Sequence, residues 1–426
     1  MNIFWFRRDL RLQDNTGLAN ALSSNKTTLP IFIFDDHILS KLPKDDPRVN
    51  FIYDCLKKIN NKLSFHQSGI KIFKGNVIET WKEILLNNEI EAVYFNHDYE
   101  PYARERDKEV YNLLTKSGIV IKNYKDQVIF EKKEVVKKDG LPYTVFTPFK
   151  NKWLEHYENK EDITNPEKDF SKLHKFQHNF PDKESLGIKS SALKVKDWNT
   201  SEIELYEETR NFPSLSSTSF LGPHLRFGTV SIRQLVKAAQ KRSAVFLSEL
   251  IWREFFMQIL WNFPNSATSN FKPKYNQIEW RNNEKEFEAW CKGETGYAIV
   301  DAGMRELNKT GYMHNRVRMI TASFLVKHLL IDWRWGEAYF AEKLLDYEQS
   351  SNVGNWQWAA GTGCDSSPYF RVFNPYEQVK KFDKDFKYIK KWVPEFQELT
   401  YAQPIVEHKL GRERAIKTYK EGLNRI

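Results

Sequence analysis

Residues 352–365 read NVGNWQWAAGTGCD, and two tryptophans stand two positions apart within this stretch. Because of that spacing, Trp356 and Trp358 project in different directions and can do different jobs. The glycines around them predict a loop rather than a helix. Tryptophans in a loop are less readily explained as core than tryptophans on a helix. The stretch therefore predicts an aromatic surface that stacks on a planar ligand or carries electrons.

The rest of the C-terminal half is also rich in tryptophan and mostly helical in pattern. Nine of the 13 tryptophans of the chain lie between Trp252 and Trp392. Residues 247–261 are apolar on nearly every face, which predicts a buried helix. Residues 315–334 form a second long helical stretch. We therefore expect residues 201–426 to form a mostly α-helical domain.

Residues 1–125 alternate short apolar runs with longer amphipathic stretches. The expected strands are residues 2–6, 29–34, 70–73, 92–95 and 119–121. The expected helices are residues 49–66, 77–88 and 103–116. This alternation predicts an α/β domain with a Rossmann-like parallel sheet. Neither GxGxxG nor a P-loop motif occurs, so a dinucleotide or nucleoside triphosphate site has no support in this domain.

Residues 126–200 differ from both flanking regions. Between residues 158 and 196 the chain is rich in Lys, Asp, Glu, Ser and Asn. That composition predicts a long linker between the two domains.

Composition bounds the class of protein. A hydrophobic fraction of 41% suffices for sizeable cores, and the net charge of +9 is a modest hint of a nucleic-acid partner. A slightly basic enzyme with no such partner explains the charge equally well. The three cysteines form no CxxC pair, which disfavours disulfides and suits a reducing cytoplasm. With no leader pattern and no apolar stretch of about 20 residues, we expect a cytoplasmic, monomeric protein away from membranes.

Hydrolytic and metal chemistry lack their usual motifs. The ten histidines form no HExxH and no Cys/His cluster, so no metal site is expected. No GxSxG nucleophile elbow occurs.

Two helical stretches combine charged residues with aromatic ones. Glu249, Trp252 and Arg253 share one helix face through their spacing. Trp252 could stack on a base while Glu249 hydrogen-bonds to it; the alternative is an internal Glu–Arg ion pair. In the second stretch, Arg316 and Arg318 point to different faces. One could meet phosphate while the other pairs inward, and the alternative is an ordinary amphipathic helix.

Five motifs occur in order along the chain. They are FWFRRDLRLQDN (4–15), ELIWREF (249–255), TGYMHNRVRMITASFLVKHLLIDWR (310–334), NVGNWQWAAGTGCD (352–365) and PYFRVFNP (368–375). Together they resemble the photolyase/cryptochrome family. The similarity extends over nearly the whole chain, and within the family it is greatest to class I cyclobutane pyrimidine dimer photolyases.

The resemblance implies an antenna-type α/β domain in residues 1–125, a linker in 126–200, and an FAD-binding and lesion-binding helical domain in 201–426. It implies that Tyr206, Thr218 and Ser219 hold the FAD phosphates and ribityl chain, and that Phe220, Leu221 and Gly222 also belong to the cofactor site. The family usually has Arg and Ser where this chain has Phe220 and Gly222. It implies that the rest of the FAD site includes Phe246, Glu249, Arg253, Tyr312, Asn315, Arg318, Asp346, Glu348 and Asn352. Asp346 is expected to accept hydrogen bonds from the flavin while paired with Arg318.

The resemblance also assigns roles to the tryptophans. Trp356, Trp333 and Trp280 match a chain that carries electrons between flavin and surface. Trp252 and Trp358 match the pair that encloses a flipped lesion.

Other matched positions contact DNA or tune the flavin. Glu249 and Met319 match residues beside the pyrimidines, and Arg316 and Arg371 match phosphate contacts. Asn352 matches the position facing flavin N5, where a neutral amide is typical of photolyases.

The implied activity is blue-light-driven repair of cyclobutane pyrimidine dimers. A flipped dimer enters the pocket, receives one electron from excited reduced FAD, splits and returns the electron. Because no net redox change results, the enzyme is a carbon–carbon lyase, a deoxyribodipyrimidine photolyase.

Three alternatives remain. A cryptochrome photoreceptor is disfavoured by Asn352 and by the lack of a long tail after Glu407. A (6-4) photolyase is disfavoured because Asn315 and Met319 stand where such enzymes have histidines. A nucleic-acid binder with a relict flavin site is the third.

A second, antenna chromophore is possible in the N-terminal domain. Residues 99–107 read YEPYARERD, which is more similar to members that bind deazaflavin or a second flavin than to folate-binding members. A protein without an antenna chromophore is the alternative.

Overall fold

The computed structural model describes residues 1–158, 169–176, 179–215 and 217–425. Its contacts divide the chain into two compact units. The first unit contains residues 1–134, 154–198 and 220–241, and the second contains residues 135–153, 199–219 and 242–426. The two units therefore interleave along the sequence more than the predicted boundaries at residues 125 and 200 suggest.

The first unit is built on a five-stranded parallel sheet with the strand order β3-β2-β1-β4-β5. The strands are β1 (Asn2–Phe6), β2 (Thr28–Asp35), β3 (Lys71–Gly75), β4 (Ala92–Asn96) and β5 (Val120–Tyr124). The predicted α/β fold with a parallel sheet is thus confirmed. Apolar runs identified the central strands β1, β2 and β4, which are buried along their whole length because both faces of the sheet are covered.

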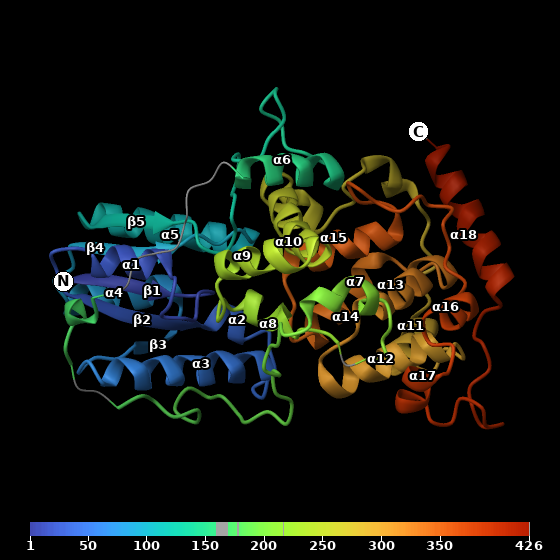
Figure 1. Ribbon diagram of the computed structural model, residues 1–426, viewed down its shortest axis with the longest axis horizontal. Helices are drawn as coiled ribbons and strands as arrows, with labels where there is room; N and C mark the ends of the chain where they lie inside the picture. Colours follow the sequence, from blue (N-terminus) through green and yellow to red (C-terminus); the bar gives the residue numbers. More distant parts are fainter. Residues whose placement is uncertain (159–168, 177–178, 216, 426) are drawn as a thin grey trace. The chain divides into compact units, whose positions relative to one another are not determined.

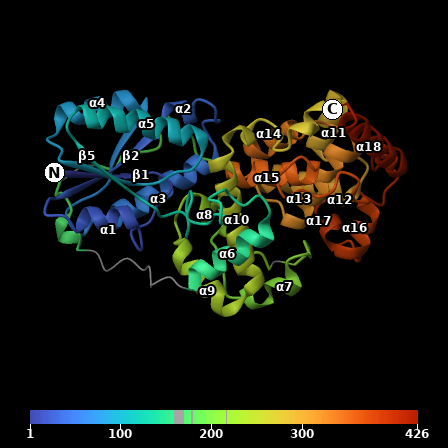
Figure 2. The ribbon, with the colours of Figure 1, turned by 90° about the horizontal axis from the view of Figure 1, so that it is seen from above.

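Helices cover both faces of this sheet. They are α1 (Thr16–Leu22), α2 (Asp36–Leu39), α3 (Pro47–Ser64), α4 (Val77–Asn87) and α5 (Pro101–Lys116). Phe4 packs with residues of α1 and α3, whereas its neighbour Trp5 packs with residues of α4 and α5. Figure 2 shows α4 and α5 on one side of the sheet and α1 on the other. The sequence pattern missed α1 and α2, which are too short for a clear helical period.

The predicted linker is partly folded. Helix α6 (Phe146–Glu158) lies within it, and so does a 3₁₀ turn at Phe170–Lys172. Leu173 and Leu186 are buried in the core that covers one face of the sheet. Part of the polar stretch 158–196 lies outside the described residues. The described part shows why polarity misled: a few apolar side chains anchor an otherwise polar segment.

Most of the remaining helices, which Figure 1 labels, belong to the second unit. In chain order they are α7 (Tyr206–Thr209), α8 (Leu221–Arg226), α9 (Ile232–Arg242), α10 (Ala244–Asn262), α11 (Glu284–Lys292), α12 (Ala298–Thr310), α13 (Asn315–Ser323), α14 (Trp333–Lys343), α15 (Gln349–Ala360), α16 (Pro375–Phe382), α17 (Lys387–Trp392) and α18 (His408–Leu423). Helices α8 and α9 belong to the first unit apart from the last residue of α9. The predicted helical domain is confirmed as a fold, and Trp290, Trp333 and Trp356 lie in its core.

The predicted loop around the two tryptophans is wrong, because Trp356 and Trp358 lie on α15. Gly354 is inside the helix, where a Cβ atom would overlap the ring of Phe256. The glycine therefore permits close packing of α15 on α10 instead of breaking the helix. The later Gly361 does end it, in a left-handed conformation with φ of 87°.

The predicted continuous helix over residues 315–334 is also wrong. Helix α13 runs into a π-helical turn at Phe324–His328, and the chain then reverses. Leu330 has a left-handed φ of 53°, and Asp332 caps the start of α14 by accepting a hydrogen bond from the Arg334 backbone N–H. This reversal gives Trp333 its position at the first turn of α14.

Candidate functional site

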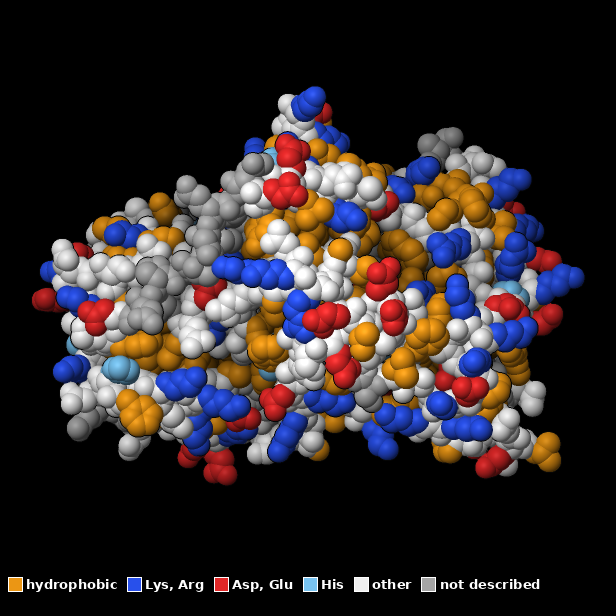
Figure 3. Space-filling model, viewed as in Figure 1, with side chains coloured by type: hydrophobic (Ala, Val, Ile, Leu, Met, Phe, Trp, Pro, Cys, Tyr) orange, Lys and Arg blue, Asp and Glu red, His pale blue; other side chains and the backbone are white. Residues whose placement is uncertain are grey.

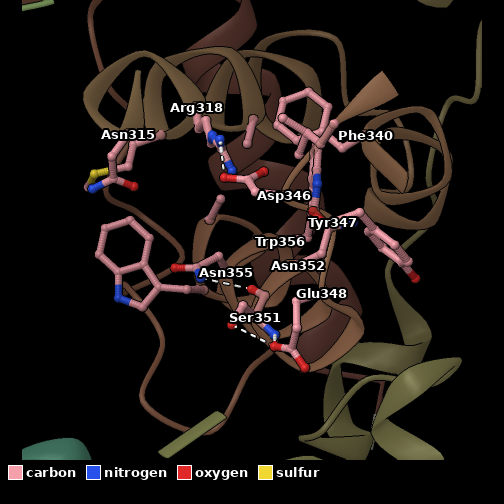
Figure 4. Close-up of a pocket in the computed structure, with 15 residues that line it drawn as sticks. Asn315, Arg318, Phe340, Asp346, Tyr347, Glu348, Ser351, Asn352, Asn355 and Trp356 are labelled. Atoms are coloured by element: carbon pink, nitrogen blue, oxygen red, sulfur yellow. Dashed lines mark hydrogen bonds and ion pairs between the residues drawn. The ribbon is translucent and has the colours of Figure 1, made fainter. Parts of the chain in front are cut away.

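A pocket opens in the second unit among α13, α14, α15 and the segment before α15. Its lining residues are Asn315, Arg318, Met319, Ala322, Phe340, Leu344, Asp346, Tyr347, Glu348, Ser351, Asn352, Asn355, Trp356, Trp358 and Ala359. Figure 4 shows the labelled polar side chains converging on one space. The pocket thus collects eight of the predicted site residues from two sequence motifs and the segment between them.

Asp346 and Arg318 form the predicted ion pair. Arg318 Nη2 lies 2.8 Å from Asp346 Oδ2, and Arg318 Nε donates to the Met313 carbonyl oxygen at 2.8 Å. The other carboxylate oxygen, Asp346 Oδ1, is buried and has no hydrogen-bond partner among the described residues. Since buried acceptors are normally paired, this atom is suited to accept a hydrogen bond from a ligand N–H.

Asn352 is held by a residue that the sequence motifs did not mark. Its Nδ2 donates to Glu337 Oε1 at 2.9 Å and to the Glu337 carbonyl oxygen at 3.1 Å. Burial raises the pKa of the Glu337 carboxyl, while the hydrogen bonds from Asn352 and Tyr347 oppose the shift. The amide of Asn352 is therefore fixed in one orientation before any ligand binds.

Glu348 caps the start of α15. Its carboxylate accepts hydrogen bonds from the Ser351 backbone N–H at 3.2 Å and from the hydroxyls of Ser350 and Ser351 at 2.5 and 2.9 Å. A carboxylate at this position satisfies open N–H groups and is stabilised by the helix dipole. Glu348 thus lines the pocket while capping the helix.

Two of the three predicted electron-carrying tryptophans lie on the consecutive helices α14 and α15, and Trp280 lies in the segment before α11. Trp356 is buried on α15, and a Cβ atom at Gly336 of α14 would overlap its ring. Trp333, one turn earlier on α14, is also buried and donates from Nε1 to Asn270 Oδ1 at 2.8 Å. The segment of Trp280 joins the turn before α14 through a 2.8 Å hydrogen bond from the Arg281 N–H to the Leu330 carbonyl.

The opposite part of the pocket is less polar. Trp358, Asn315 and Met319 line it together. The Met319 sulfur lies 3.6 Å from Arg316 Nη1, which donates to it. These side chains give an aromatic wall beside a polarisable apolar one.

Glu249 and Trp252 are not among the residues that line this pocket. Glu249 forms an ion pair with Arg210 at 2.6 Å, so the internal Glu–Arg pair exists, with a partner that helix spacing did not indicate. Trp252 is stacked on Phe146 of α6, with ring centroids 3.6 Å apart and an interplanar angle of 8°. One face of Trp252 is therefore already covered.

Three arginines form a cationic cluster. Burial lowers the pKa of Arg316, and the positive charges of Arg210 and Arg371 lower it further. Arg316 Nη2 donates to Asn211 Oδ1 at 2.5 Å, and Arg371 is exposed. Such a concentration favours an anionic partner. On the face drawn in Figure 3, Lys and Arg are scattered among acidic side chains.

The remaining predicted FAD residues are distributed over both units. Tyr206 packs edge-on against Phe246 at 5.1 Å in the second unit, where Thr218, Ser219, Arg253 and Tyr312 also lie. Phe220, Leu221 and Gly222 belong to the first unit. None of these residues lines the pocket. Their cofactor contacts therefore stay predictions.

Sequence reasoning missed Arg210, Glu337 and Phe146. Arg210 stands one helical turn after Tyr206, a spacing that could have marked it. Glu337 stands one turn after Trp333 on the same helix. Phe146 carried no signal, because its contact with Trp252 joins distant parts of the chain.

In the first unit, the segment of the proposed antenna site lies beside the ends of two strands. Tyr102 stacks on His37 at 4.5 Å with an interplanar angle of 12°, and its hydroxyl donates to Asp35 at the end of β2. Burial and the neighbouring Asp35 raise the pKa of Tyr102. Arg7 and Arg106 both pair with Asp107. The carboxyl edge of a parallel sheet is where such folds bind ligands.

Both halves of the chain match models of known protein families. The model of the family described as DNA photolyase matches residues 2–168, and that of the FAD binding domain of DNA photolyase matches residues 246–400. A deoxyribodipyrimidine photo-lyase of Halobacterium salinarum is 35% identical over 99% of each chain. That of Escherichia coli is 34% identical over 98% of each chain.

Solved structures are similar over the full length. A class III photolyase from Agrobacterium tumefaciens has a TM-score of 0.86 at 31% identity, covering 100% of this chain and 98% of that one. An archaeal photolyase from Sulfolobus tokodaii with two FAD molecules has a TM-score of 0.82 at 35% identity, covering 99% and 100%. A Synechocystis cryptochrome shares the fold, with a TM-score of 0.80 at 24% identity, covering 98% and 99%. None of the described helices has the length and apolar character needed to cross a membrane.

Proposed function

The chain belongs to the photolyase/cryptochrome family, and we propose that it is a blue-light-driven photolyase that repairs cyclobutane pyrimidine dimers in DNA. FAD, when bound, supplies a light-driven one-electron donor. The observation that carries the proposal is the pocket, which combines an open buried carboxylate oxygen with an aromatic and thioether wall.

The polar residues of the pocket fit a flavin ring. Asp346 Oδ1 is a buried acceptor without a partner among the described residues, which suits a ring N–H. Arg318 keeps the carboxylate ionised and orients it. Asn352, fixed by Glu337, presents its amide at a constant orientation. These side chains are in place before binding, which reduces the ordering that binding requires.

The choice of lesion follows from proton chemistry. Repair of a (6-4) photoproduct requires a proton donor, whereas a cyclobutane dimer opens once it has gained an electron. Histidine is the usual donor near neutral pH, and no histidine occurs among the described residues that line the pocket. His314 lies next to Asn315 in sequence, but its Nδ1 accepts a hydrogen bond from the Arg316 N–H and caps α13.

The state of His314 further supports cyclobutane dimers. Burial lowers its pKa to about 4, and the charges of Arg318 and Arg316 add to the effect. It is therefore neutral near pH 7 and carries no proton on the capping nitrogen. Met319 and Asn315, which do line the pocket, are not acids at that pH.

The test uses two oligonucleotides, one with a cyclobutane thymine dimer and one with a (6-4) photoproduct. Each is illuminated with fully reduced protein, and restored thymines are measured by chromatography. We expect restoration of the cyclobutane dimer alone. Restoration of the (6-4) product alone would overturn the lesion assignment, and restoration of neither would favour a cryptochrome-type photoreceptor. Protein kept in the dark is the control.

A second chromophore is proposed for the first unit. The flat stack of Tyr102 on His37, at the carboxyl edge of the sheet, offers an aromatic surface to such a group. Chromophores released from the purified protein are separated and counted. Two equivalents per chain, with one lost in Tyr102→Ala, support the site. A single equivalent of chromophore in the unaltered protein would contradict the proposed second site.

A further inference from the structure

A second row of oxidisable rings leads away from Trp356. Trp290, on α11, has its ring centroid 6.1 Å from that of Trp356, and Tyr339, on α14, lies 5.8 Å from Trp290. We propose that Trp290 and Tyr339 form a second electron-donating branch to Trp356, parallel to Trp333 and Trp280. The inference rests on the proposed function, because it requires light-driven oxidation of Trp356.

Helix α14 carries members of both branches. Trp333 starts the helix, and Gly336 one turn later is the point at which the helix backbone meets the Trp356 ring. Tyr339 lies a further turn along. Trp356 therefore lies at a fork, with Trp333 toward the start of α14 and the Trp290–Tyr339 pair toward its end.

Trp290 is suited to pass a positive hole onward rather than to keep it. Its side chain is 0% exposed, and its Nε1 donates at 3.1 Å to the Thr321 carbonyl oxygen, which is too weak a base to take the proton. The hole on Trp290 keeps its proton and stays reactive. Because electron tunnelling weakens steeply with distance, the neighbouring Tyr339 ring is a natural next donor.

Tyr339 is suited to end the branch. Its hydroxyl donates to Asn308 Oδ1 at 2.6 Å and to the Cys291 carbonyl at 3.2 Å, and it is only half-buried. Burial raises its pKa to about 12, so the group is a neutral phenol near pH 7. Lys343 Nζ lies 5.5 Å from the ring centroid and disfavours a cationic radical there. Oxidation of Tyr339 is therefore coupled to release of its proton.

One electron moves from Trp290 to oxidised Trp356, which restores Trp356 and leaves a cation radical on Trp290. One electron then moves from Tyr339 to Trp290, the phenolic proton passes to water, and a neutral tyrosyl radical remains. A soluble thiol returns a hydrogen atom to Tyr339 and becomes a thiyl radical.

The two branches differ in the radical at which they end. The first ends in a tryptophanyl radical at Trp280, and the second ends in a tyrosyl radical. Time-resolved absorption and electron paramagnetic resonance distinguish the two species without any measurement of repair. In Trp333→Phe protein, where the first branch is blocked, we expect a long-lived tyrosyl radical after a light flash.

Double variants separate the members of the branch. Adding Tyr339→Phe to Trp333→Phe should remove the tyrosyl signal, and adding Trp290→Phe should reduce long-lived radicals to the level of Trp356→Phe. Trp335→Phe is the matched control, because it lies on α14 and its ring contacts Phe287, at 5.2 Å. It should leave the signal unchanged. All variants are compared at equal flavin content.

Two outcomes separate the failure of this inference from that of the proposed function. If Trp333→Phe and Trp356→Phe lose all long-lived radicals equally, the second branch does not exist, although the main chain does. If Trp356→Phe retains the radicals of the unaltered protein, light-driven oxidation does not pass through Trp356, and the premise fails instead. Tyr339→Phe, at a half-buried position, keeps the test available if Trp290→Phe does not fold.

Discussion

The floor of the pocket and a second group of residues outside the pocket lining, called the rim below, are organised differently. The floor, defined by Arg318, Asp346 and Asn352, holds its groups by internal contacts but leaves Asp346 Oδ1 open. The rim, defined by Arg210, Glu249, Trp252, Arg316 and Arg371, has contacts within the protein for its main groups, as in Glu249–Arg210 and Trp252 on Phe146. The floor is therefore ready for a ligand, whereas the rim must exchange contacts to bind one.

This difference predicts how each region contributes to function. Groups that are already oriented lose little freedom on binding, so changes in the floor should act on cofactor affinity and electron transfer. The rim combines a cationic cluster with aromatic rings, so changes there should act on DNA binding and its salt dependence.

The largest effect should come from Trp356→Phe, beside the floor. Both proposed electron-transfer branches begin at this ring, and phenylalanine is not oxidised under these conditions. We expect light-driven reduction of oxidised FAD to be lost, while repair survives in protein whose FAD is reduced chemically beforehand. Absorption spectra during illumination measure the photoreduction of FAD, and the amount of restored thymine measures repair. Undiminished photoreduction would remove the assignment of Trp356.

Asp346→Asn should have the next largest effect. The change keeps the shape of the side chain but removes the charge that Arg318 and a flavin N–H require. Hydrogen bonds to charged groups contribute about 1.5–3 kcal/mol, so FAD binding should weaken on the order of tenfold to a hundredfold. Titration of flavin-free protein with FAD measures the affinity. Asp385→Asn, at an exposed position on the same unit, is the control and should bind FAD normally.

The sequence predicted the floor better than the rim, for a physical reason. Arg318 and Asn352 belong to motifs that carry the family resemblance, and Asp346 lies in the segment between those motifs. The contacts of these three residues lie within neighbouring elements. The three central strands, β1, β2 and β4, were found because each is a buried apolar run. The contacts of the rim join distant segments: Phe146 reaches Trp252, and Arg210 reaches Glu249.

Local signals failed where tertiary packing decided the outcome. Gly354 predicted a loop, but it lies in α15 because Phe256 fills the space where a side chain would stand. Leu330 looked helical, yet it adopts a left-handed conformation that turns the chain toward α14. Both conformations depend on contacts with residues far away in the sequence. A pattern read over a short stretch of sequence does not include those residues.

Trp252→Ala should weaken binding to damaged DNA more than binding to undamaged DNA. Stacking on an extruded base is worth about 1–3 kcal/mol, and only the lesion-containing strand extrudes one. Phe146→Leu, which removes the ring that supports Trp252, should give a smaller loss of the same kind. Binding of both oligonucleotides by each variant is measured by fluorescence anisotropy. Equal weakening on both DNAs would mean that Trp252 is only part of the core.

The smallest effect should come from the arginines of the rim, and it should appear in the salt dependence. Each phosphate contact that is lost should reduce the slope of log K against log salt concentration by about 0.9 for duplex DNA. Arg371→Gln should show this reduction fully, because Arg371 is exposed and its charge is available to phosphate. Arg316→Gln should show it only if Arg316 exchanges its bond with Asn211 for a phosphate. Lys417→Gln, on the exposed face of α18, is the control and should leave the slope unchanged. Unchanged slopes for both arginine variants would mean that the cationic cluster is structural, and the contrast between an open floor and an exchanging rim would fail at that point.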